Sequence, residues 1–155
     1  VYEKEIDTVV CLEGSEVIGT FLARQLSQKN LFSLSSEKNI CVVAPEHDSN
    51  GLLIFRDNLR PMVSEKNVLL LISTVNSGKT AARALECIEY YGGTTHGVAA
   101  VFSALKQVGD IPVISLFSPE DIPGYVTSLV KDCPMCKAGQ KIDALSNSYG
   151  FSPLT

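Results

Sequence analysis

The sequence predicts an α/β fold in which a parallel, Rossmann-like β-sheet carries helices on both of its faces. Short apolar runs without charged residues, such as 68–72 (VLLLI), alternate with segments whose apolar residues recur at helical spacing. Strands of this composition are buried on both sides, which is typical of parallel sheets covered by helices. With 155 residues, 45% of them hydrophobic, the chain is long enough for one core, and we expect a single domain over 1–155.

The first half of the chain predicts three strands and one helix. Residues 8–12 form a short apolar run, and 16–28 carry apolar residues at helical spacing. Residues 40–44 form a second run rich in β-formers. Turn residues fill 46–51 before a strand resumes at 52–55, so this part predicts a β-hairpin or an excursion from the sheet.

The second half predicts three further strands and a second helix. Residues 68–72 form a buried strand, and a helix is expected over 81–91. Two more strands are expected at 97–102 and 113–117. After Pro119 the periodic pattern decays, and we expect a polar tail.

Composition excludes several classes of partner. Thirteen basic and seventeen acidic residues give a net charge of −4, and no basic stripe is present, which argues against binding to nucleic acid. The longest apolar runs are too short to cross a bilayer, and no secretion signal opens the chain. Three of the five cysteines lie in apolar patterns, as reduced core cysteines do, so we expect a cytoplasmic protein.

Residues 73–80 (STVNSGKT) are expected to form a polar loop between a strand and a helix. This order directs backbone N–H groups and a helix N-terminus toward one point, which suits a phosphate group. One interpretation is a divergent P-loop, with Lys79 on the phosphates and Thr80 on Mg²⁺, although Ser73 replaces its first glycine. A simpler interpretation is an ordinary polar turn that binds nothing.

A third interpretation comes from a family resemblance. The segment 68–80 resembles the phosphoribosyl-pyrophosphate motif of type I phosphoribosyltransferases, whose pattern is roughly VLLVDDVITTGGT. Residues 68–71 match the strand, and 75–78 with Thr80 match the phosphate-binding turn. Ile72 and Ser73 occupy the positions where the family has two adjacent acidic residues, so the catalytic residues of this chain stay unknown.

Two other segments carry the same resemblance. Residues 8–20 resemble the family segment in which a strand turns into the pyrophosphate-binding loop, and Glu13, Gly14 and Ser15 match that turn. Residues 132–142 resemble the C-terminal segment of some orotate phosphoribosyltransferases. The resemblance therefore touches three places in the same order as in the family.

The resemblance implies a transferase of pyrimidine nucleotide biosynthesis. Such an enzyme moves ribose 5-phosphate from phosphoribosyl pyrophosphate to a nitrogen base such as orotate, with Mg²⁺, and works as a homodimer. It implies that the 5′-phosphate of phosphoribosyl pyrophosphate or a nucleotide is held by Asn76, Ser77, Gly78, Lys79 and Thr80. The missing acidic pair favours an alternative, a non-catalytic module that senses phosphoribosyl compounds or nucleotides. Because little sequence precedes Asp7, we expect the base-binding hood to come from a segment before Val1.

The remaining candidates have simpler explanations. Arg56 and Arg60 are possible substitutes for the basic residues of the family's flexible loop, or solvated surface charges. His47 is expected in an exposed turn, and His96 is expected to be structural. The single C-x-x-C motif at 133–136 has no second pair at zinc spacing, so a structural zinc would need another chain, and we assign no metal ligands.

Overall fold

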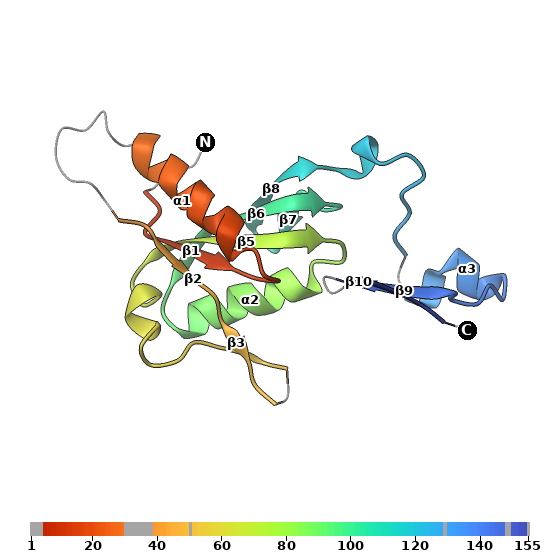
Figure 1. Cartoon of the computed structure of the whole chain (residues 1–155), viewed down its shortest axis with the longest axis horizontal. Helices are drawn as coiled ribbons and strands as arrows, with labels where there is room; N and C mark the ends of the chain where they lie inside the picture. Colours follow the sequence, from red (N-terminus) through yellow and green to blue (C-terminus); the bar gives the residue numbers. More distant parts are fainter. Residues whose placement is uncertain (1–4, 30–38, 50, 129, 148–149, 155) are drawn as a thin grey trace. The chain divides into compact units, whose positions relative to one another are not determined.

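The computed structural model divides the chain into two compact units, Val1–Asp121 and Ile122–Thr155. Figure 1 shows the order of the helices and strands along the chain. The expectation of a single domain over 1–155 stays a prediction. The structure describes most of the chain, in the ranges 5–29, 39–49, 51–128, 130–147 and 150–154.

A six-stranded sheet with the order β2-β1-β5-β6-β8-β7 forms the centre of the first unit. Strand β1 pairs in parallel with β2 and β5, and β6 pairs in parallel with β5 and β8, whereas β7 is antiparallel to β8. The predicted parallel α/β sheet is therefore confirmed. The elements of this unit's core are β1 (Thr8–Cys11), α1 (Glu16–Lys29), β2 (Cys41–Val43), β5 (Asn67–Val75), α2 (Lys79–Tyr90), β6 (Thr94–Ser103), β7 (Gln107–Val108) and β8 (Ile111–Phe117).

The two long helices cover opposite faces of this sheet, because alternate side chains of β5 point to opposite sides. Leu70 and Ile72 belong to a buried cluster that includes Ile88 of α2. Leu71 belongs to a second buried cluster that includes Ala23 of α1. The apolar run in the sequence thus supplies both cores at once, as expected for a strand buried on both faces.

Close packing of α1 on the sheet depends on a glycine. A Cβ atom at Gly19 would overlap the sulfur of Cys11 and lie 3.3 Å from Cγ1 of Val42. Cys11 is buried, and its burial raises the pKa of the thiol to about 11. The Cys11 thiol is therefore neutral at physiological pH and fills space in the core.

The loop after β5 is shorter than the sequence predicts. The expectation that a loop begins at Ser73 is wrong, because β5 continues to Val75 and α2 already begins at Lys79. The extension is held by pairing with β6, in which Thr74 lies opposite Phe102 and Val75 opposite Ser103. The polar turn is therefore limited to residues 76–78.

The segment between β2 and β5 leaves the main sheet as a hairpin, one of the two predicted possibilities. Strands β3 (Glu46–His47) and β4 (Leu53–Ile54) pair antiparallel. Arg56 donates to the Glu46 carboxylate at 2.7 Å, which ties the segment after β4 to β3. A 3₁₀ helix, η2 (Arg60–Met62), then leads toward β5.

The expected polar tail after Pro119 contains regular structure. The helix η3 (Pro119–Asp121) closes the first unit. In the second unit, β9 (Ala144–Asn147) and β10 (Gly150–Pro153) pair antiparallel, after η4 (Val130–Asp132) and α3 (Pro134–Lys137). Backbone pairing, which apolar periodicity does not report, organises this part of the expected polar tail. Across the described ranges, no helix has both the length and the apolar character needed to span a membrane.

Candidate functional site

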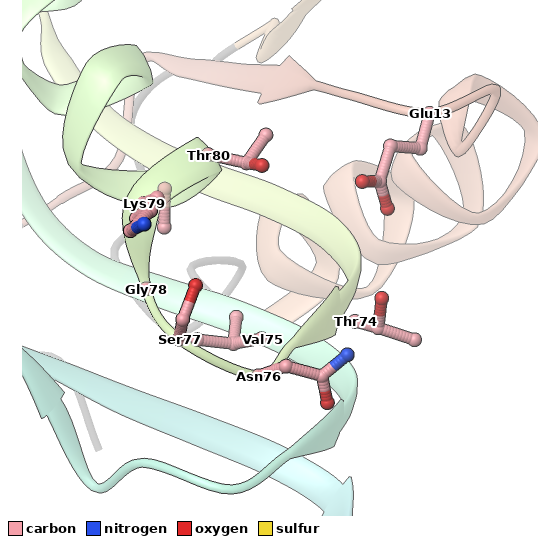
Figure 2. Close-up of a pocket in the computed structure, with 9 residues that line it drawn as sticks. Glu13, Thr74, Val75, Asn76, Ser77, Gly78, Lys79 and Thr80 are labelled. Atoms are coloured by element: carbon pink, nitrogen blue, oxygen red, sulfur yellow. The ribbon is translucent and has the colours of Figure 1, made fainter. Parts of the chain in front are cut away.

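A pocket of about 220 Å³ lies at the carboxyl end of β5. This is the edge at which open parallel sheets bind their ligands. Figure 2 shows the pocket between the β5–α2 turn and the turn that follows β1. It brings together all five predicted phosphate-binding residues, whose role stays a prediction; the lining is Glu13, Thr74, Val75, Asn76, Ser77, Gly78, Lys79, Thr80 and Ala81.

One wall of the pocket is the N-terminus of α2. Its N-cap, Gly78, has φ of 75° and lacks a side chain that would cap the first N–H groups of the helix. A Cβ atom there would also lie 3.0 Å from Cδ1 of Leu105, so the position favours glycine on both conformational and steric grounds. Uncapped N–H groups, the positive end of the helix dipole and the Lys79 ammonium together suit an anion such as phosphate.

The opposite wall carries a carboxylate. Glu13 lies in the turn between β1 and α1 with φ of 57°, a left-handed conformation that is uncommon for residues other than glycine. Its carboxylate accepts a hydrogen bond from the hydroxyl of Ser73. Figure 2 shows the Glu13 side chain extending toward the β5–α2 turn.

The three predicted pyrophosphate-binding residues therefore separate in the structure. Glu13 lines the pocket, while Gly14 is an exposed turn residue with φ of 73°. Ser15 is buried, and its hydroxyl lies 3.4 Å from the carbonyl oxygen of Leu71. Glu13 alone of the three lines the pocket in the part of the chain that the structure describes, and the pyrophosphate role of all three stays a prediction.

The two positions that are acidic in the family point to opposite sides of β5. Ile72 is 0% exposed and packs in the core beside α2. Ser73 is partly exposed on the other side and reaches Glu13. The contact between Ser73 and Glu13 was not predicted; the only signal for it was that both residues fall in segments with a phosphoribosyltransferase resemblance.

The described residues do not provide a ready metal site. No group of three His, Cys, Asp or Glu side chains in the described ranges could hold a metal ion. Among the described residues that line the pocket, Glu13 contributes the carboxylate and Lys79 the cation. The Mg²⁺ that the family resemblance implies therefore lacks a preformed set of protein ligands here, although Mg²⁺ commonly binds through substrate phosphates and few carboxylates.

The two arginines that were possible substitutes for a basic loop do not line this pocket. Arg56 is exposed and pairs with Glu46, and its hydrogen bond to that carboxylate raises the arginine pKa and lowers the pKa of Glu46. Arg60 is exposed in η2. Both positions agree with the simpler explanation of surface charges.

Neither the histidines nor the cysteines of the C-x-x-C motif are among the described residues that line the pocket. His47 is exposed on β3, and Nε2 of His96 lies 2.8 Å from Oδ1 of Asn67. Within the second unit, Cys133 caps α3 and accepts a hydrogen bond from the N–H of Cys136 at 3.3 Å. That N–H lowers the pKa of Cys133, whereas the thiol hydrogen bond to Cys133 raises the pKa of Cys136.

A second hollow of about 320 Å³ lies near the start of β6. It is larger than the pocket at the carboxyl end of β5, but it lies at the amino end of a parallel strand, the edge where such sheets rarely bind ligands. For this reason we assign the candidate site to the smaller pocket. The larger hollow is lined by Leu85, Glu89, Gly93, Thr94, Thr95 and Ile111.

Comparison with solved structures identifies the fold. Adenine phosphoribosyltransferase from Rhodothermus marinus superposes with a TM-score of 0.52 and 16% identity, over 75% of this chain and 71% of that chain. Orotate phosphoribosyltransferase from Mycobacterium tuberculosis, in complex with 5-phospho-α-D-ribosyl 1-diphosphate, gives a TM-score of 0.54 and 16% identity over 77% and 66%. The chain therefore has the type I phosphoribosyltransferase fold.

A relative of similar sequence supports the same family. The chain is 26% identical, over 140 residues, to orotate phosphoribosyltransferase from Chlorobaculum parvum. The match covers 88% of this chain and 64% of that protein, so the chain spans about two thirds of its relative's length. No family model matches the chain. Fold and sequence likeness together support the type I phosphoribosyltransferase family that the loop motif indicated.

The burial of Ile72 leads to a first prediction. An Ile72→Asp variant should lose roughly 3–5 kcal/mol of unfolding free energy, because it places an uncompensated carboxylate in the core. An Ile72→Val variant, the matched control, should lose about 0.5–1.5 kcal/mol. Urea denaturation, monitored by circular dichroism, measures the unfolding free energy of both variants. Equal unfolding midpoints for the two variants would show that position 72 faces solvent or the pocket.

Proposed function

We propose that this chain is a phosphoribosyltransferase-like protein that binds the 5′-phosphate of a phosphoribosyl compound at the N-terminus of α2. The observation that carries the proposal is the shared pocket of Asn76, Ser77, Gly78, Lys79 and Thr80. Backbone N–H groups, two hydroxyls and one ammonium there match the acceptor oxygens of a phosphate. A phosphoribosyltransferase fold that presents this turn supports the same ligand.

The reaction that the family implies is the first candidate activity. Phosphoribosyl pyrophosphate would give its ribose 5-phosphate group to a nitrogen base and release pyrophosphate. An orotate-like pyrimidine is favoured by the curated relative and by the resemblance of residues 132–142. Adenine phosphoribosyltransferases are equally similar in fold, so the base is chosen here on sequence likeness alone. Any Mg²⁺ would enter with the phosphate groups of the ligand.

A second candidate is a non-catalytic module that senses a phosphoribosyl compound or nucleotide. The burial of Ile72 favours it, since no ligand hydroxyl can reach a side chain in the core. The divergent P-loop is less well supported. A P-loop wraps its backbone around the phosphates, and the turn here spans only residues 76–78.

Phosphate binding should depend on the Thr80 hydroxyl. We expect ribose 5-phosphate to bind the full chain, and a Thr80→Val variant to bind about tenfold more weakly, because a hydrogen bond to a charged group is lost. The exposed Thr127→Val is a control expected to leave affinity unchanged, since Thr127 is not among the described residues that line the pocket. Isothermal titration calorimetry measures the affinity of the unmodified chain and of both variants for ribose 5-phosphate. Tight binding of Mg-ATP without binding of ribose 5-phosphate would instead favour the P-loop interpretation.

Turnover should be slow. Two lost hydrogen bonds to charged groups correspond to about 3–6 kcal/mol, or roughly two to four decades in rate. We therefore expect pyrophosphate release from phosphoribosyl pyrophosphate, across a panel of pyrimidine and purine bases, to be slower by that factor than with the Chlorobaculum parvum relative assayed in parallel. A rate equal to that of the relative with any base would contradict the importance of positions 72 and 73. The absence of measurable pyrophosphate release with every base of the panel would favour the sensor.

The apolar surface of α1 supports the expected homodimer. Val17 is 70% exposed and Phe21 is 63% exposed on this helix, and neighbouring exposed apolar side chains often mark a contact with another chain. We expect a dimer in light scattering coupled to size-exclusion chromatography, and a shift toward monomer in a Phe21→Asp variant. The exposed Gln25→Asp on the same helix is the matched control. A monomeric unmodified chain would contradict the proposal.

A further inference from the structure

The two ends of the candidate pocket have opposite charge character. The α2 end offers N–H groups, hydroxyls and the Lys79 ammonium, all of which donate hydrogen bonds. The β1 end offers the carboxylate of Glu13, whose oxygens accept hydrogen bonds. A ligand that spans the pocket must therefore present acceptors at one end and donors at the other.

The Glu13 carboxylate is held in place by its neighbour. The hydroxyl of Ser73 donates to Oε2 of Glu13, and Ser73 lies within β5, whose last two residues, Thr74 and Val75, line the pocket. Because Ser73 is neutral, this contact orients the carboxylate without cancelling its charge. Among the lining residues within the described ranges, Lys79 supplies the cation, and it belongs to the α2 end.

We propose that Glu13, oriented by Ser73, makes this site selective for sugar 5-phosphates whose ring hydroxyls face the carboxylate, and against sugars that carry pyrophosphate there. Sugar hydroxyls can donate hydrogen bonds to Glu13, whereas phosphate oxygens are acceptors and carry the same sign of charge. The inference rests on the proposed phosphate binding at α2. It names the ligand class as ribose 5-phosphate and 5′-nucleotides with one phosphate, and it therefore favours the second candidate function, the sensor, over transfer from phosphoribosyl pyrophosphate.

This assignment reverses the role expected for Glu13 from the family resemblance. A pyrophosphate-binding position gains from N–H donors or cations, whereas a carboxylate beside it repels an anion, because the two charges have the same sign. The geometry also gives a reason for the replaced acidic pair. Ile72 faces the core, so Glu13 from another loop brings the carboxylate back to the pocket, beside the Ser73 side chain.

The test compares the two ligands on the full chain. Isothermal titration calorimetry at neutral pH, in the presence of EDTA so that no Mg²⁺ masks the pyrophosphate, gives Kd for ribose 5-phosphate and for phosphoribosyl pyrophosphate. We expect the unmodified chain to bind ribose 5-phosphate at least about tenfold more tightly. In Glu13→Gln the ratio of the two constants should fall by about tenfold, mainly through tighter binding of phosphoribosyl pyrophosphate.

Two more variants sharpen the test. Ser73→Ala removes the hydrogen bond that orients the Glu13 carboxylate. The ratio of the two dissociation constants should therefore fall, but by less than in Glu13→Gln. Glu16→Gln removes an equal charge from the exposed first turn of α1, outside the pocket lining, and should leave the ratio unchanged. Circular dichroism checks that each variant is folded. Because Glu13 is exposed, we expect Glu13→Gln to fold. If it does not, the ratio of dissociation constants measured for Ser73→Ala tests the inference alone.

The outcomes separate this inference from the proposed function. Equal affinity of the unmodified chain for the two ligands would overturn the inference while leaving phosphate binding intact. The same holds if Glu13→Gln gives the ratio found for Glu16→Gln. If neither ligand binds the unmodified chain, the proposed phosphate site and the inference both fail.

Discussion

The first unit depends on strand β5, because this strand pairs with both β1 and β6 and contributes side chains to both hydrophobic cores. Burial on both faces requires a run of apolar residues with no charge, which is what 68–72 provide. The same strand delivers the chain to the turn at 76–78 and from there to the N-terminus of α2. Sheet order, core packing and the position of the pocket are thus consequences of one buried strand.

The pleat of β5 also decides what positions 72 and 73 can do. Successive side chains of a strand point to opposite faces, so two adjacent residues cannot both line the same core. In this chain the first of them, Ile72, joins the core with α2, and the second, Ser73, meets Glu13 from the β1–α1 turn. Ile72 therefore stabilises the core, and Ser73 is left as the member of this pair that contacts a residue lining the pocket.

Periodicity in the sequence was enough to predict the helices and the parallel sheet, because both depend on local patterns of apolar residues. A turn directly before the second long helix was also predictable, because glycine and hydroxyl residues favour helix N-termini; its phosphate-binding role stays a prediction. Three features were not predictable. The length of β5 past Ser73 depends on pairing with β6, the hairpin of β9 and β10 lacks apolar alternation, and the contact of Ser73 with Glu13 joins residues 60 positions apart.

Phosphate binding and turnover differ in how strongly they depend on side-chain identity. In the proposed site, a phosphate at the N-terminus of α2 would be held largely by backbone N–H groups, which depend on the helix rather than on particular side chains. Transfer of a ribose group requires carboxylates at defined positions, and those can be lost while the backbone stays the same. At 16% identity the solved phosphoribosyltransferases share the fold of this chain. The proposed phosphate site therefore rests on the pocket at the N-terminus of α2, and Glu13 and Ser73 are the side chains that we propose distinguish a sensor from a transferase.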